Sequence, residues 1–178
     1  MNVMPIVPHV GIGPLKLGMT PDQILDAVNQ IPVEWNLPDG GEVEISNDLQ
    51  GPQDETYIRR YINKTFFFMV EYRDEKAVEI AVDYQLREYV FITLYETDVF
   101  KVPAEQLVVF LKQYSPCSYD LNDEQLSTNY EFHDIGIRLW REIPFHLKLL
   151  SDEEYMRDMA LVIDEMFHYL YFEIIGVR

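Results

Sequence analysis

The stretch TFFFMVEYRDEKAVEIAVDY, residues 65–84, consists of two alternating segments joined by a short charged turn. In both segments every second residue is apolar, which is the period of a β-strand with one buried face. The apolar positions of one face are Phe66, Phe68, Val70 and Tyr72 in the first segment, and Val78, Ile80, Val82 and Tyr84 in the second. Because RDEK at 73–76 is a turn signal, the stretch predicts an antiparallel β-hairpin.

Strand and helix patterns continue on both sides of this hairpin. Alternation and turn residues predict further strands at 57–62, 88–97, 130–141 and 169–177, with a bend at 134–136. Helical spacing predicts helices after Thr20, from Pro103 and after Ser151. The last helix is expected to bury Tyr155, Met159, Val162 and Met166. An antiparallel sheet with helices packed on one face follows, which is an α+β fold class.

The order of these elements suggests one domain with internal similarity. We expect a single domain, 1–178, with halves at 1–97 and 98–178. Each half places a helix that starts at proline before antiparallel strands. This order predicts a degenerate two-fold repeat.

Closely spaced glycines precede the first helix in HVGIGPLKLGMTPDQILDAV, residues 9–28. Gly13 and Gly18 have the spacing of a phosphate-binding loop, but Met19 stands where that loop needs its lysine. Thr20, with proline next and glutamine three residues on, is instead a good helix start. The glycines therefore predict a structural turn and no cofactor site.

The segment GPLKLGMTPDQI, residues 13–24, resembles the start of the SmpA/BamE and β-lactamase-inhibitor-like repeat. In that repeat a Gly-Met-Thr turn, here Gly18-Met19-Thr20, opens a helix that lies on an antiparallel sheet. The resemblance implies a protein that binds other proteins and is not catalytic. Outer-membrane members carry a lipoprotein signal, which residues 1–10 do not show.

Charge excludes some partners. The chain carries 31 acidic and 14 basic residues, a formal net charge of −17 at pH 7. Residues 1–89 hold 15 acids and 7 bases, and residues 90–178 hold 16 and 7, so both halves are negative. Such a field repels nucleic acid and anionic lipid and attracts cationic proteins, although solubility alone also explains acidity. With a single cysteine and no apolar run of about 18 residues, we expect a cytoplasmic protein without a nucleic-acid or membrane partner.

Few residues of the sequence are candidates for catalysis or metal binding. Glu165 and His168 form half of a di-iron helix motif, and no second copy is present. Cys117 could act as a nucleophile only with a paired histidine such as His133 or His146. We therefore predict no catalytic residues, no metal site and no cofactor.

Small size, acidity and a sheet-plus-helix pattern together resemble the immunity proteins of bacterial toxin systems, such as contact-dependent growth inhibition. The resemblance implies that the chain neutralises a cognate cationic toxin domain, of a nuclease type, by covering its active site. The expected contact residues are Glu42, Glu44, Asp48, Asp54 and Glu55 in one loop, Asp120, Asp123 and Glu124 in another, and Trp35. The alternatives are a non-catalytic scaffolding domain, a homodimer formed through an open sheet edge, and a small enzyme using Cys117 or His133.

Overall fold

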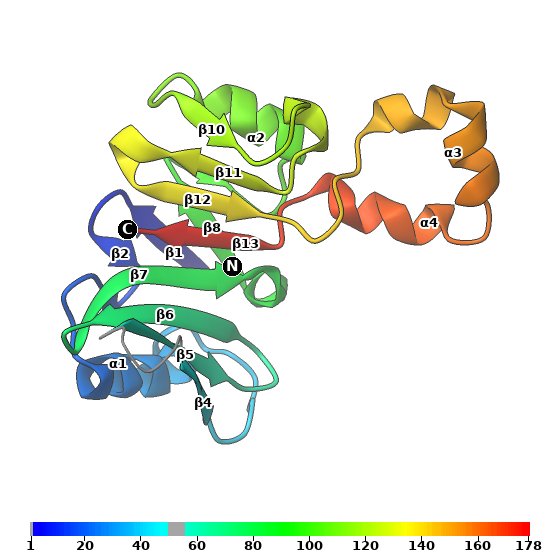
Figure 1. Cartoon of the computed structure of the whole chain (residues 1–178). Helices are drawn as coiled ribbons and strands as arrows, with labels where there is room; N and C mark the ends of the chain where they lie inside the picture. Colours follow the sequence, from blue (N-terminus) through cyan, green and yellow to red (C-terminus); the bar gives the residue numbers. More distant parts are fainter. Residues whose placement is uncertain (1, 50–55) are drawn as a thin grey trace.

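An eight-stranded antiparallel sheet forms the centre of the molecule, which the computed structural model describes over residues 2–49 and 56–178 (Figure 1). The strand order is β10-β11-β12-β13-β7-β6-β5-β4. One meander comprises β4 (Glu44–Leu49), β5 (Thr56–Ile62), β6 (Phe67–Arg73) and β7 (Lys76–Asp83). The other comprises β10 (Cys117–Tyr119), β11 (Asn129–Phe132) and β12 (Ile137–Trp140), and β13 (Ile174–Val177) joins the two.

The predicted hairpin at 65–84 is confirmed as β6 and β7, at the middle of this sheet. Phe66, Phe68, Val70 and Tyr72 are all completely buried. They form one side of the core because successive strand residues point to opposite faces. The expected α+β class, with an antiparallel sheet, is also confirmed.

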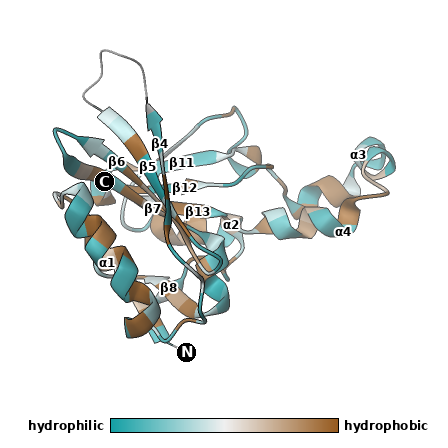
Figure 2. Cartoon of the chain, turned by 90° about the horizontal axis from the view of Figure 1, so that it is seen from below, coloured by the Kyte–Doolittle hydropathy of each residue, from teal (hydrophilic) through white to brown (hydrophobic). Residues whose placement is uncertain are grey.

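A second layer covers one face of the larger sheet. It contains a five-stranded sheet in the order β3-β2-β1-β8-β9, together with two helices. Its members are β1 (Asn2–Val7), β2 (Gly11–Ile12), β3 (Leu15–Lys16), β8 (Val90–Leu94), β9 (Thr97–Asp98), α1 (Pro21–Glu34) and α2 (Ala104–Leu111). Figure 2 shows α1 and β8 on the same side of the larger sheet. One continuous apolar core lies between the layers.

The glycine-rich segment before α1 is a structural turn, as the sequence predicts. Gly18 has φ +81°, and its amide donates to Ala77 O at 2.8 Å, so the turn joins the start of β7. Thr20 and Gln23 form both hydrogen bonds of a capping box at the start of α1. The helix then buries Ile24, Val28 and Ile31 against the sheet.

Two strand predictions are wrong in detail. In the segment 88–97, Glu88 ends a short 3-10 helix (Tyr84–Glu88), β8 extends only to Leu94, and a turn then leads to Thr97 at the start of β9. The segment 130–141 is a hairpin of β11 and β12, because Gly136 takes a left-handed φ of +59° and reverses the chain. The predicted internal repeat stays a prediction, although a helix precedes each meander.

The predicted long helix after Ser151 is wrong. It consists of two short helices, α3 (Glu153–Asp158) and α4 (Ile163–Met166), flanked by 3-10 turns. Of the four residues expected in the core, only Met166 is buried, and Val162 is exposed. This segment projects beyond the end of the sheet, to the right in Figure 1.

Among the described residues, every helix is too short or too polar to cross a bilayer.

Candidate protein-binding surface

The face of the larger sheet opposite α1 is open. Within residues 2–49 and 56–178, no helix or second sheet lies on it, and Figure 1 looks onto it. The strand positions that alternate with the core side chains point outward here. Ala81 among them is buried, and their larger apolar members are partly exposed: Ile58, Ile62, Phe67, Met69, Trp140 and Ile174. Trp140 therefore lies on the face expected from the sequence, opposite Ile137 and Leu139.

Three ion pairs cross the open face. Arg60 pairs with Asp48, Arg138 with Glu79, and Arg178 with Glu131. The Arg138–Glu79 pair links β12 to β7 above β13, and a Cβ atom on Gly176 of β13 would lie 2.8 Å from the Glu79 carboxylate. The glycine therefore leaves room for the pair. The three arginines are thus paired with carboxylates of the same face.

The first predicted patch lies at the β4 edge of the open face. Glu42 and Glu44 are exposed and form no ion pair with any described residue. Together with Ile62 and Lys64 they line a hollow of about 540 Å³. Asp48 is less available because it pairs with Arg60. Asp54 and Glu55 lie outside the described residues, so Glu42 and Glu44 are the members of this patch that the structure describes as exposed.

The carboxylates of the second predicted patch bind groups within the chain. Asp123 accepts from Lys148 Nζ at 2.5 Å and caps the 3-10 turn at Glu124–Leu126. Glu124 pairs with Lys112. Asp120 accepts from the Thr128 amide at 2.9 Å and from its hydroxyl at 2.5 Å. These contacts hold the 120–129 loop closed.

Asp120 makes the loop sensitive to acid. Burial pushes the pKa of Asp120 upward, but hydrogen bonds from Thr128 and Asn129 outweigh it and lower the pKa to about 2. A carboxyl whose pKa is lower in the folded state stabilises the fold above its unfolded pKa of about 3.9, and this contribution is lost as the pH falls through 2. We expect Asp120→Asn to lower the free energy of unfolding by about 1 kcal/mol at pH 6 and by progressively less toward pH 2.

Urea unfolding at several pH values measures this difference. Asp26→Asn on the exposed side of α1 is the matched control, because Asp26 has no hydrogen-bond partner among the described side chains. Its effect is expected to be near zero at every pH. A constant Asp120→Asn effect from pH 6 to pH 2 would contradict the assignment.

The sheet order separates the two predicted patches. One patch follows β10 and the other includes β4, and these strands form the two edges of the eight-stranded sheet. Seven strand spacings of about 4.8 Å place them roughly 30 Å apart. The structure therefore does not bring the two patches together into one site.

Trp35, one of the predicted contact residues, helps to hold α1 and β1 together. It ends α1 and is half-buried against the core. Its indole Nε1 donates to Val3 O at 3.3 Å, and its own carbonyl accepts from Asn2 at 2.8 Å. These bonds fasten β1 to the end of α1.

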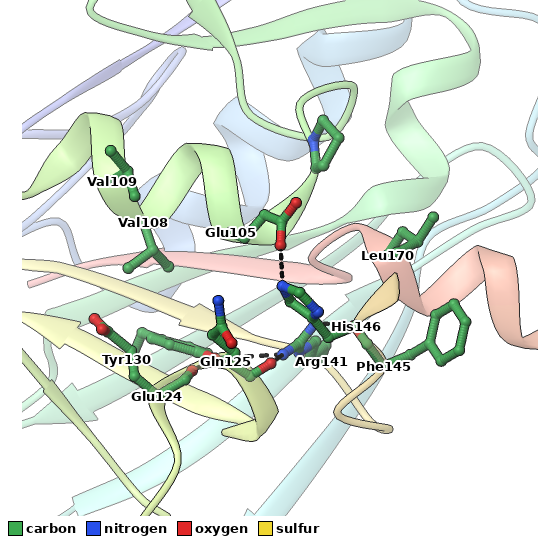
Figure 3. Close-up of a pocket in the computed structure, with 11 residues that line it drawn as sticks. Glu105, Val108, Val109, Glu124, Gln125, Tyr130, Arg141, Phe145, His146 and Leu170 are labelled. Atoms are coloured by element: carbon green, nitrogen blue, oxygen red, sulfur yellow. Dashed lines mark hydrogen bonds and ion pairs between the residues drawn. The ribbon is translucent and has the colours of Figure 1, made fainter. Parts of the chain in front are cut away.

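A small cavity beside α2 contains the most buried cation of the chain's described part. It measures about 90 Å³ and is lined by residues of α2, β11 and the segment after β12 (Figure 3). Arg141 is 2 % exposed, and its guanidinium donates to Tyr130 Oη and to the carbonyls of Gln125, Ser127, Phe145 and Tyr169. Every donor of this arginine is thus used within the chain.

His146 completes the wall of this cavity. Its Nδ1 accepts from the Lys148 amide at 2.9 Å, so the ring proton lies on Nε2, which faces Glu105. A cavity of about this size holds a few water molecules. The arrangement ties α2 to the segment after β12, and we interpret it as structural.

The residues considered for catalysis are not arranged together. His133 Nε2 lies 3.0 Å from Ser118 Oγ, and Cys117 points to the opposite face of β10. Burial, and then the nearby Glu124, raise the pKa of the Cys117 thiol to about 11, which disfavours the thiolate. His168 contacts Glu173 at 3.4 Å, and no group of three or more metal-binding side chains occurs among the described residues.

Sequence reasoning missed the projecting segment after β12. Its apolar residues have helical spacing, and the sequence does not reveal that no other element covers them.

Comparison of the chain with protein-family models, with curated proteins and with solved structures gives no match, so its function has to be inferred from its own surface.

Proposed function

We propose that this chain is an acidic immunity protein that binds a cognate cationic toxin domain and blocks its active site. The observation that carries the proposal is the β4 edge of the open face, where Glu42 and Glu44 line one hollow without ion-pair partners in the described chain. The partly exposed Ile62 lies beside them. An interface of this kind combines apolar contact with unpaired charge.

The net charge of the chain also supports the proposed binding of a cationic domain. A formal charge of −17 attracts a basic domain from a distance and raises the association rate. Toxins that cleave nucleic acid need a basic cleft for the phosphate backbone, because phosphate contacts supply most of the affinity. A carboxylate-lined surface that occupies this cleft excludes the substrate without any bond-making step.

The edges of the sheet disfavour the alternative of a homodimer through strand pairing. The β10 edge is three residues long, and the β4 edge carries Glu44 and Asp48. Short strands and charged side chains are the features that prevent edge-to-edge association.

The proposal requires a basic toxin domain encoded next to the gene of this chain. The test pairs the chain with that domain, inactivated for binding measurements and active for protection of cells. We expect protection and a nanomolar complex whose association slows about tenfold or more at high salt. Glu42→Lys with Glu44→Lys should weaken binding about tenfold or more, because two attractive contacts become repulsive.

The control for this test is Asp26→Lys with Glu34→Lys, which makes the same change of charge on α1, away from the open face. We expect a loss below about threefold for this variant, from long-range charge alone. If the Glu42/Glu44 variant and the control behave alike, this edge is not the contact. The absence of any complex with the toxin domain would overturn the proposed function.

A further inference from the structure

The connection between β12 and β13 is far longer than the sheet requires. Trp140 and Ile174 are directly paired neighbours, and Glu173 N donates to Trp140 O at 2.9 Å. A tight turn of two residues can join strands placed in this way. The chain instead uses residues 141–173 for the connection. Long connections of this kind usually serve a function.

We name residues 152–167 the arm. At its outer end Leu161 is 99 % exposed, so its side chain has almost no contact with the described residues, and the neighbouring Val162 is 38 % exposed. Figure 1 shows this segment pointing away from the sheet, and Figure 2 shows hydrophobic and hydrophilic residues mixed along it. An almost fully exposed leucine at the tip of a projection gains apolar contact only from another molecule.

The root of the arm is firmly packed. Phe145 is 1 % exposed and contacts the ring of Phe167, with centroids 5.7 Å apart. Arg141 donates to Phe145 O at 2.8 Å and to Tyr169 O at 3.3 Å. This buried side chain therefore binds the backbone both before and after the arm. The tip is therefore presented by a fixed base, which lowers the entropy that binding would cost.

Charge selects the kind of partner. Residues 152–165 contain six acids and one base, Arg157, which lies near Glu154 and Asp158. The exposed acids are Asp152, Glu153, Glu154, Asp158, Asp164 and Glu165. They repel nucleic acid, an anionic membrane and a second copy of this acidic chain. A basic protein with an apolar depression inside its cleft matches both the charge and the exposed tip.

We propose that the arm inserts into the basic cleft of the partner, with Leu161 as the apolar anchor and the surrounding carboxylates facing the cations of the cleft wall. This inference rests on the proposed binding of a cationic protein domain and identifies a second contact, distinct from the β4 edge. An anchor surrounded by charges is a common interface design, because the rim keeps water from the centre.

The test measures affinity of the inactivated basic toxin domain for three variants of the full chain. Leu161→Ala should weaken binding about tenfold or more, since a fully buried leucine anchor is lost. Asp164→Lys with Glu165→Lys should weaken it to a similar degree and reduce the salt dependence. Val33→Ala, at a 77 % exposed position on α1, is the matched control with no expected change.

The outcomes separate this inference from the proposed function. Thermal unfolding should be unchanged in Leu161→Ala, because the side chain has no core contact to lose. If the unmodified chain binds tightly and both arm variants bind with the same affinity, the proposed insertion of the arm is contradicted and the proposed function is not. No binding by the unmodified chain would overturn both.

Discussion

Arg141→Met is expected to lower the free energy of unfolding by about 3–5 kcal/mol, the largest effect that we predict for a single substitution in this chain. The guanidinium is buried and satisfies four backbone carbonyls and one hydroxyl. Methionine replaces only the aliphatic part of the arginine side chain and donates no hydrogen bond. Each carbonyl left unpaired in the interior costs about 1–3 kcal/mol before the structure relaxes.

Urea unfolding followed by circular dichroism measures this loss. Arg157→Met is the matched control, because Arg157 is 73 % exposed and its effect should stay within about 0.5 kcal/mol. Amide exchange should also increase in residues 145–170, since Arg141 holds both ends of that segment. A loss below about 1 kcal/mol for Arg141→Met would show that the arginine does not hold the segment.

Gly136→Ala is expected to cost about 2–4 kcal/mol, for reasons of backbone geometry and space together. Gly136 has φ +59°, and an added Cβ atom would lie 2.1 Å from Arg178 O and 2.7 Å from His9 Nδ1. The His9 ring lies between two carbonyls, with Nδ1 3.2 Å from Arg178 O and Nε2 3.0 Å from Asp134 O. The substitution therefore separates three segments that meet at this turn.

Gly18→Ala is the control for this prediction. Gly18 also has a positive φ, +81°, but an added Cβ atom there would have no neighbour within 4 Å. Its cost should be limited to backbone strain of about 1 kcal/mol. The difference between the two variants, measured by thermal or urea unfolding, isolates the steric part. Equal costs would mean that the turn at Gly136 relaxes to accept a methyl group.

Local signals in the sequence predict the parts of the fold that depend on local interactions. The capping box at Thr20 and the alternation in 65–84 place α1, β6 and β7, because both patterns act over a few residues. The parallel pairing of β1 with β8 was not foreseen, since it joins residues about half the chain apart. The sequence predicts only a bend where Gly136 reverses the chain, because alternation continues on both sides of it.

The candidate surface is predictable only in part from the sequence. The polar surroundings of Glu42 and Glu44 indicate exposed side chains, and in the structure these two residues line one hollow. Asp120, Asp123 and Glu124 were selected by the same signal, but their hydrogen bonds and ion pairs form only in the folded loop. The apolar spacing of the arm suggested a core helix, because a pattern does not show whether another element is present to cover it.

The position of β13 has a consequence for biosynthesis. Among the thirteen strands of the described residues, β13 is the last in the sequence, yet it lies between β12 and β7 in the interior of the sheet. While the ribosome is still making the preceding residues, the two meanders remain separate, and each has an unsatisfied strand edge of apolar sequence. Folding of the complete sheet is therefore delayed until β13 has been translated, and until then the unpaired edges of β12 and β7 are open to aggregation.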